Sequence, residues 1–237
     1  MRASRPGRRP LEVFRVGRIG YREGLSLQAE LVERRRAGSI SDHLLLLEHP
    51  HVISLGTSAG ADHVLADAPT LDALGVELHE SPRGGDVTYH GPGQLVGYAV
   101  LDLKPDRQDL HRYLRDLEEV LIRTLTAFAV EARREPGLTG VWTKGGKVAA
   151  IGVRVSSGWI TSHGFALNIS TDLSYFRTIV PCGIEGRPVT SLEALLGRTV
   201  EQNAVADEVV RHFADVFGRE PGARQPPPSA PSGAANS

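Results

Sequence analysis

Residues Arg83 to Gln94 read Arg-Gly-Gly-Asp-Val-Thr-Tyr-His-Gly-Pro-Gly-Gln, and this stretch is the most informative in the chain. Its four glycines and Pro92 exclude a regular helix, whereas Val87-Thr88-Tyr89 favours a short strand between two glycine turns. Such turns let main-chain N–H groups approach a ligand closely. The pattern therefore predicts a binding loop, with a solvated glycine-rich hairpin as the alternative. It matches neither of the glycine-rich nucleotide-binding fingerprints.

Composition limits the class of protein. Of the 237 residues, 41% are hydrophobic and 23% are charged, which is typical of one globular domain with a substantial core. The formal net charge of −1 gives no reason to expect nucleic acid as a partner. No apolar run approaches the roughly 18 to 20 residues of a membrane span. The single cysteine, Cys182, excludes an internal disulfide and agrees with a cytoplasmic location.

The two ends of the chain differ from its middle. Residues 1–10 contain four arginines and no apolar segment, so they are predicted to be a disordered arm rather than a secretory signal, with a transit peptide as the alternative. Residues 219–237 are rich in Pro, Ala and Ser and are predicted to be a disordered tail. Residues 11–218 then form a single domain. Removal of 219–237 is expected to leave stability unchanged.

Hydrophobic periodicity predicts an α/β protein of the α+β type. Helices are expected over 21–37, 69–74 and 109–130, and two more are expected to start at the capping boxes Thr190-x-x-Glu193 and Thr199-x-x-Gln202. A helical turn is expected at 172–176. Strands are expected at 11–16, 42–48, 52–55, 76–80, 94–103, 130–133, 141–143, 147–155 and 159–169. Together these elements predict a mixed, largely hairpin-built β-sheet with packed helices.

The sequence Arg-Gly-Gly-x-x-Thr-Tyr-His-Gly-Pro-Gly-Gln-Leu-Val resembles the signature of the lipoyl(octanoyl) transferases, the octanoyl-acyl carrier protein:protein N-octanoyltransferases. The resemblance covers about residues 11–218 and implies the biotin/lipoate protein ligase-like fold. One departure is Ala99, where the family usually has proline after Gly-Tyr. Three further blocks fit in the same order: Gly146 to Gly152, His163 to Asn168, and Ile179 to Ile184 with Val189 to Leu192.

The resemblance implies a function. The enzymes of this family take an octanoyl group from octanoyl-acyl carrier protein and place it on a lysine of a lipoyl domain, the first step of endogenous protein lipoylation. Implied acceptors are the lipoyl domains of 2-oxoacid dehydrogenase complexes and the glycine cleavage H protein. No cofactor, metal or nucleotide is implied.

The resemblance also implies a Cys182–Lys147 dyad, in which Cys182 carries the acyl group as a thioester. From the residues alone, a lone cysteine such as Cys182 is more often a small buried hydrophobe, and Lys147 would be interpreted as an exposed lysine of a hairpin. Lys144 lies outside the motif. His90 is a candidate to assist the reaction. The residues implied to bind substrate are Arg83, Gly84, Gly85, Asp86, Val87, Thr88, Tyr89, His90, Ala150, Ile151, Gly152, Gly164, Phe165 and Ala166.

Two other functions are compatible with the sequence, an ATP-dependent lipoate or biotin protein ligase and a non-catalytic module that docks carrier or lipoyl domains. Because acyl carrier proteins are acidic, a carrier-binding enzyme is expected to have a local basic patch. His49 and His51 have no matching cysteine or carboxylate cluster, which argues against a metal site. The basic residues that flank the motifs are Lys144, Arg154, Arg177 and Arg187.

Overall fold

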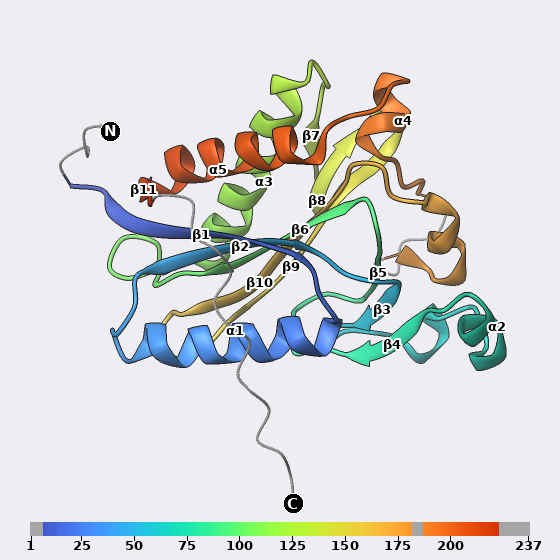
Figure 1. Cartoon of the computed structure of the whole chain (residues 1–237), viewed down its shortest axis with the longest axis horizontal. Helices are drawn as coiled ribbons and strands as arrows, with labels where there is room; N and C mark the ends of the chain where they lie inside the picture. Colours follow the sequence, from blue (N-terminus) through green and yellow to red (C-terminus); the bar gives the residue numbers. More distant parts are fainter. Residues whose placement is uncertain (1–6, 182–186, 223–237) are drawn as a thin grey trace, which may run out of the picture.

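An eight-stranded mixed sheet runs through the centre of the protein in the order β11-β1-β2-β6-β10-β9-β8-β7 (Figure 1). The computed structural model describes residues 7–181 and 187–222. β1 is parallel to β2 and β11, and the other neighbours are antiparallel. The strands are β1 (Arg9–Arg18), β2 (Asp42–Glu48), β6 (Gln94–Val100), β7 (Arg133–Glu135), β8 (Leu138–Thr143), β9 (Gly146–Val155), β10 (Thr161–Asn168) and β11 (Arg219–Pro221).

Helices cover both faces of this sheet. α3 (Leu110–Ala127) and α5 (Gln202–Phe217) lie on one face and α1 (Tyr21–Arg36) on the other (Figure 1). The periodic stripe of α3 faces the core, where Tyr113, Leu117, Leu121 and Leu125 are each 0% exposed. Full burial of an apolar side chain of this size contributes about 1.5–3 kcal/mol. Leu110 is the exception, since it is 43% exposed in the first turn of α3.

A second, three-stranded sheet carries the glycine-rich stretch. Its order is β4-β3-β5, in which β3 is antiparallel to β5 and parallel to β4. The sheet packs with short helices around its own apolar cluster, which includes Ile53, Leu71 and Tyr89. Its elements and the remaining helices are β3 (Val52–Leu55), β4 (Glu77–Glu80), β5 (Val87–His90), η1 (Ala61–His63), α2 (Ala68–Ala73), η2 (Leu173–Thr178) and α4 (Leu192–Leu196).

The predicted capping boxes are wrong in detail. Ser191 caps α4, accepting the Ala194 N–H at 3.3 Å, and α5 begins after Glu201 without a side-chain cap. The Thr190 N–H bonds to the Lys147 carbonyl at 3.0 Å, which keeps Thr190 extended and moves the helix start one residue on. The strand expected over 130–133 is also misplaced, because β7 begins only at Arg133.

Both predicted domain boundaries need correction. Arg9 and Pro10 belong to β1, and Arg219–Pro221 form β11 parallel to it. Composition misjudged position 219 because an arginine can be buried when a carboxylate neutralises it: Arg219 is 2% exposed and its Nε lies 2.7 Å from Asp42 Oδ2. Residues 1–6 and 223–237 lie outside the described residues, so disorder there stays a prediction.

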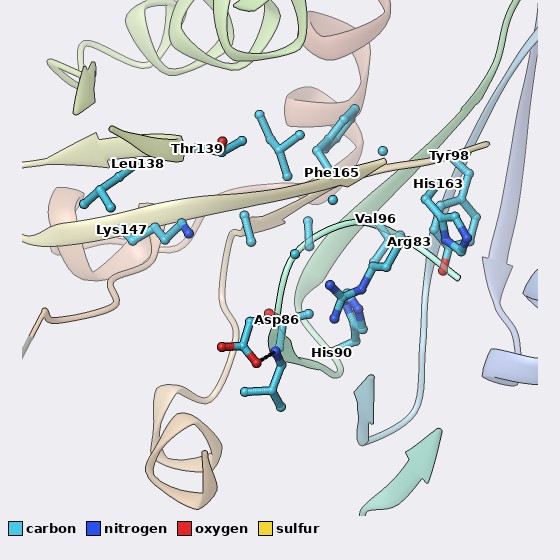
Figure 2. A pocket seen from close by; sticks show the side chains of 18 of the residues that line it. Arg83, Asp86, His90, Val96, Tyr98, Leu138, Thr139, Lys147, His163 and Phe165 are labelled. Carbon is cyan, nitrogen blue, oxygen red and sulfur yellow. Dashed lines mark hydrogen bonds between the residues drawn. The ribbon is translucent and has the colours of Figure 1, made fainter. Parts of the chain in front are cut away.

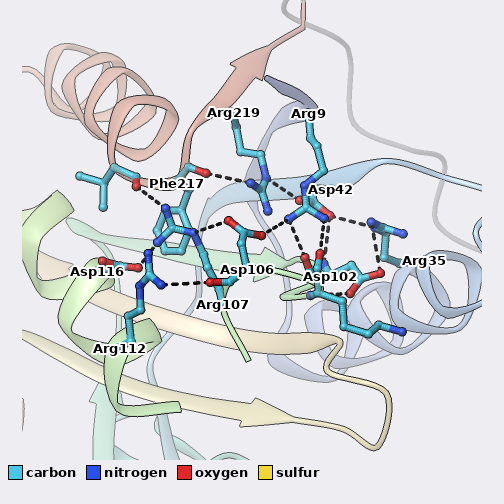
Figure 3. A network of polar contacts seen from close by, with 12 residues as sticks. Arg9, Arg35, Asp42, Asp102, Asp106, Arg107, Arg112, Asp116, Phe217 and Arg219 are labelled. Carbon is cyan, nitrogen blue, oxygen red and sulfur yellow. Dashed lines mark hydrogen bonds and ion pairs between the residues drawn. The ribbon is translucent and has the colours of Figure 1, made fainter. Parts of the chain in front are cut away.

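Asp42 is the centre of the buried charge network that holds β11 (Figure 3). Its other oxygen accepts from Arg35 Nε at 2.8 Å and from the Asp102 N–H at 3.0 Å. Arg9 reaches the same region and donates to the Asp102 carbonyl at 2.9 Å. Arg35 and Arg219 both neutralise the same buried carboxylate, so removal of one leaves charge without full compensation.

We therefore predict that Arg219→Ala lowers the free energy of unfolding by about 3 kcal/mol, because it leaves Asp42 buried with one guanidinium fewer. Deletion of 219–237 should be as damaging, contrary to the sequence-based expectation. Urea denaturation measures both effects. Glu220→Ala, one residue further along β11, is the control and should change stability by less than about 0.5 kcal/mol. Equal effects of the two substitutions would contradict this account of β11.

Candidate active site

A cavity of about 240 Å³ lies between β5, the glycine-rich loop before it, and strands β6, β9 and β10 of the large sheet (Figure 2). Lys147 lies at one end and Tyr98 and His163 at the other (Figure 2). Of the residues implied by the family resemblance, the structure brings these together on the cavity wall: Arg83, Gly85, Asp86, Val87, Thr88, His90, Lys147, Ala150, Ile151, Gly152, Gly164, Phe165 and Ala166.

Gly84 and Tyr89 do not line this cavity. Side chains alternate along a strand, so Thr88 and His90 face the cavity while Tyr89 points to the opposite side of β5. There the Tyr89 hydroxyl is 2.7 Å from His51 Nδ1, and its ring stacks on Tyr175 with centroids 5.1 Å apart. Gly84 instead docks the loop on β9 through a hydrogen bond from its N–H to the Val153 carbonyl at 2.9 Å.

Arg83 is buried in the cavity wall and anchored to β3. Its Nη2 donates to the Ser54 carbonyl at 2.6 Å and to the Ser54 hydroxyl at 2.9 Å. The arginine side chain crosses Gly152, where an added Cβ atom would lie 3.1 Å from Arg83 Cδ. The Gly84 carbonyl oxygen would be closer still, at 2.9 Å, so glycine at this position of β9 leaves room for both the loop main chain and the arginine.

His90 has both ring nitrogens in hydrogen bonds. Gln94 Nε2 donates to Asn168 Oδ1 at 2.9 Å, so Gln94 Oε1 is the acceptor for His90 Nδ1 at 2.8 Å. The other nitrogen, Nε2, then accepts from the Ser54 hydroxyl at 3.2 Å. Burial, together with His49 and Arg83, lowers the pKa of His90 to about 3. His90 is therefore a neutral structural link rather than a general base.

Lys147 joins three parts of the site. Its main chain pairs with the segment that follows residue 186: the Lys147 N–H donates to the Pro188 carbonyl at 2.9 Å, and its carbonyl accepts from Thr190. Its side chain is 7% exposed, and Nζ lies 5.4 Å from the centre of the Trp142 ring. Besides the large cavity, Lys147 lines a second space of about 10 Å³ together with Pro181.

Cys182 lies outside the described residues, so its pairing with Lys147 stays a prediction. The nearest described residues along the chain are Pro181 on one side and Arg187 on the other. Lys144, the other lysine of this region, has a side chain that is 90% exposed and pairs with Glu131 at 4.0 Å.

Sequence reasoning missed several residues of the cavity wall. His163 belongs to a quoted motif, and its positive φ of 58° marks an unusual backbone. Burial lowers the pKa of His163 to about 4, with smaller contributions from Arg83 and Arg154. Val96 ends the motif that begins at Arg83, and Tyr98 follows it on β6. The remaining residues come from elements outside the motifs, and no local pattern signals them. The missed residues are Tyr21, Val96, Tyr98, Gly137, Leu138, Thr139 and His163.

Residues 7–181 and 187–222 contain neither a cluster of metal-ligating side chains nor a membrane-spanning helix. No group of three or more His, Cys, Asp or Glu side chains in these ranges is arranged to hold a metal ion. His49 instead bonds to the Ile19 carbonyl and to the Tyr98 hydroxyl, at 2.9 and 2.7 Å. None of the helices formed by the described residues is long and apolar enough to cross a membrane.

Comparison with solved structures identifies the fold. A bipartite lipoate protein ligase from Thermoplasma acidophilum superimposes with a TM-score of 0.74 at 16% identity, covering 93% of this chain and 88% of that one. A lipoate-protein ligase A bound with ATP gives a TM-score of 0.75 at 17% identity, covering 93% of this chain and 90% of that one. A biotin protein ligase from Aquifex aeolicus gives 0.53 at 13% identity, covering 87% and 70%. The predicted biotin/lipoate protein ligase-like fold is therefore confirmed.

Sequence comparison is more specific. A Rubrobacter xylanophilus protein named octanoyltransferase is 54% identical over 217 residues, which cover 91% of this chain and 97% of the relative. A Solibacter usitatus protein of the same name is 51% identical, covering 88% and 94%. The family model described as the lipoyl protein ligase A/B catalytic domain matches residues 20–214. The chain thus belongs to the lipoyl protein ligase A/B catalytic domain family and, within it, to the octanoyltransferases.

Proposed function

We propose that this acyltransferase moves octanoyl groups in protein lipoylation through a thioester on Cys182. The donor is octanoyl-acyl carrier protein, and the acceptor is a lysine of a lipoyl domain, in 2-oxoacid dehydrogenase complexes or in the glycine cleavage H protein. The enzyme is proposed to act in the cytoplasm.

The position of Lys147 carries this proposal. It lines an apolar-walled cavity and also the smaller space bounded by Pro181, the residue before Cys182. Its main chain hydrogen-bonds to Pro188 and Thr190, on the other side of the 182–186 segment. Described residues on both sides of Cys182 therefore contact Lys147 or line a space with it. This arrangement supports a dyad of Cys182 and Lys147.

Each half-reaction forms one bond to the acyl carbon and breaks another. In the first, the Cys182 thiolate attacks the octanoyl thioester carbon, the bond to the carrier sulfur breaks, and the carrier thiolate leaves and is protonated. In the second, the neutral amine of the acceptor lysine attacks the Cys182 thioester, an amide forms, and the Cys182 thiolate leaves. Lys147 favours the Cys182 thiolate as a nearby cation and gives its proton to the departing carrier thiolate. The neutral Lys147 amine then takes the proton that the attacking acceptor amine loses, which restores the cation.

The rest of the cavity suits an uncharged chain. Val96, Ile151 and Phe165 supply apolar walls, and each methylene that leaves water contributes about 0.8 kcal/mol. Ala150 is one of the few cavity residues that also lines the smaller space beside Pro181. The reacting carbonyl is therefore proposed to lie near Lys147, with the alkyl chain directed toward the opposite end.

The fold is shared with lipoate-protein ligase A bound with ATP, so an ATP-dependent ligase is the competing function. Intact mass spectrometry separates the two. Mixing the enzyme with octanoyl-acyl carrier protein should add one octanoyl group that hydroxylamine removes. Labelling of a lipoyl domain from free octanoate and ATP, with no reaction of the carrier-bound group, would favour the ligase. No adduct and no labelling would leave only a docking module.

The dyad gives a prediction that distinguishes its two members. Cys182→Ala should abolish both the adduct and transfer, because no other thiol is present in the chain. Lys147→Ala should lower transfer at pH 7 by roughly 100-fold or more yet keep slow acylation. Its rate should rise from about pH 7 to 9, since the thiol pKa returns toward its free value of about 8.5.

Lys104→Ala is the matched control, because Lys104 is exposed and does not line either cavity space. It should transfer octanoyl at the parent rate across the same pH range. The dyad assignment is wrong if the Lys104 and Lys147 variants behave alike, or if Cys182→Ala still transfers octanoate.

Carrier recognition is predicted to be electrostatic. Arg154, Arg177 and Arg187 are exposed, and Arg177 lies in η2, shortly before Pro181. Raising salt from about 0.02 to 0.2 M should raise the KM for the acidic carrier several-fold, because exposed charges are screened within about 10 Å at ~0.1 M. Arg177→Ala should raise this KM at low salt and weaken its salt dependence.

Arg36→Ala at the C-terminal end of α1 is the control for the carrier experiment, since Arg36 is exposed and already pairs with Glu33. It should leave both KM and its salt dependence unchanged. A carrier KM that is independent of salt would refute an electrostatic patch.

A further inference from the structure

Glu118 is a fully buried carboxylate in the middle of α3, outside the cavity wall. A buried carboxylate is costly unless cations and hydrogen bonds surround it. Arg115 Nη1 at 2.6 Å and Arg134 Nε at 3.1 Å pair with Oε2, and both arginines remain partly exposed. The other oxygen, Oε1, accepts the main-chain N–H of Gly140 at 3.1 Å. One carboxylate therefore fixes helix α3 to a single point on β8.

Gly140 has a backbone conformation that requires glycine. Its φ is 120°, which residues with a Cβ atom rarely adopt. The register between β8 and β9 shifts immediately after it, between Val141 and Trp142. Such a bulge redirects the side chains beside it, and a bulge next to a reactive group is a recurrent feature of enzyme sites.

The neighbouring strand β9 gives a second reason why residue 140 must be glycine. A Cβ atom at Gly140 would be 2.6 Å from Lys147 Cε and 2.7 Å from the Ala149 carbonyl oxygen. The lysine side chain therefore passes directly over the space that the glycine leaves. Nζ itself lies 5.4 Å from the centre of the Trp142 ring. A long flexible side chain is thus confined by a bare main chain and an aromatic ring.

We propose that Glu118 and Gly140 are positioning residues for Lys147. Glu118 holds the Gly140 main chain in place, and Gly140 in turn leaves the path along which the lysine reaches the end of the cavity near Pro181. The proposal rests on the proposed function, because it gives the dyad lysine a fixed position. The alternative is that Glu118 and Gly140 merely stabilise the hairpin of β7 and β8.

A double-mutant cycle separates these two roles. If Gly140 acts through Lys147, Gly140→Ala should lower octanoyl transfer by roughly tenfold or more in the parent enzyme and by less than about twofold in a Lys147→Ala background. A role in stability alone predicts that Gly140→Ala lowers octanoyl transfer by the same factor in both backgrounds. Transfer is measured in single turnover with octanoyl-acyl carrier protein, and thermal unfolding of every variant is followed in parallel.

Gly158→Ala is the matched control. Gly158 has a φ of 93°, and nothing lies within 4 Å of an added Cβ atom, so the substitution introduces similar backbone strain without contact to Lys147. It should lower the melting temperature but leave transfer within about twofold of the parent. Glu118→Gln removes the charge but keeps an oxygen for the Gly140 N–H. It should lower octanoyl transfer by roughly threefold or more in the parent enzyme and leave transfer unchanged in the Lys147→Ala background.

Each outcome decides between a positioning role for Glu118 and Gly140 and a role in stability alone. Equal losses in the two backgrounds, or parent-like activity of Gly140→Ala, overturn the positioning role. If Gly140→Ala does not fold, the Glu118→Gln cycle applies the same criterion. Parent-like transfer by Lys147→Ala would instead refute the proposed function, and that result is read from the single variant before the cycle is considered.

Discussion

The main-chain pairing of Lys147 with residues 188–190 is the interaction on which the site depends. Two hydrogen bonds, Lys147 N–H to Pro188 and Thr190 N–H to Lys147, attach a segment beyond β10 to the first residues of β9 in the large sheet. Asn168 reinforces the same point by donating to the Thr190 carbonyl at 3.0 Å. Because the segment is held there, its exit into α4 is fixed relative to the cavity.

Two polar side chains of the cavity wall, Arg83 and His90, are fixed by specific partners. Arg83 is anchored on Ser54, and His90 lies in a hydrogen-bond chain that continues through Gln94 to Asn168. A low pKa keeps His90 and His163 neutral at physiological pH. Satisfied buried networks are rigid, and a rigid apolar cavity holds an alkyl chain without loss of shape. The wall thus combines apolar side chains and neutral histidines with Arg83, which is held on Ser54, and with Lys147 at one end.

The fold alone does not distinguish this enzyme from ATP-dependent ligases, which share it at low identity. Function resides in the site that a fold carries. In this chain the feature that we propose to be distinguishing is the Pro181-Cys182 sequence, because Pro181 lines a small space together with Lys147. A thioester donor already carries the activation energy that a ligase obtains from ATP, so the same cavity can serve a transferase.

Most strands and helices could be predicted from local patterns. The expected boundaries of β2 and β3 agree with the structure residue for residue, because continuous apolar runs between turn residues leave one arrangement. The core face of α3 followed from its spacing. The ends of the chain were misjudged, since the burial of Arg219 depends on Asp42, a residue far away in sequence.

The sequence by itself determined the family, the mixed sheet with packed helices and most of the cavity wall, because motifs and periodicity are local properties of the chain. Only the tertiary structure decided that Tyr89 faces away from the cavity, that both ring nitrogens of His90 are hydrogen-bonded, and that Gly140 lies beneath Lys147. These facts depend on register and on contacts between distant strands. Such contacts form only when the sheets pack together.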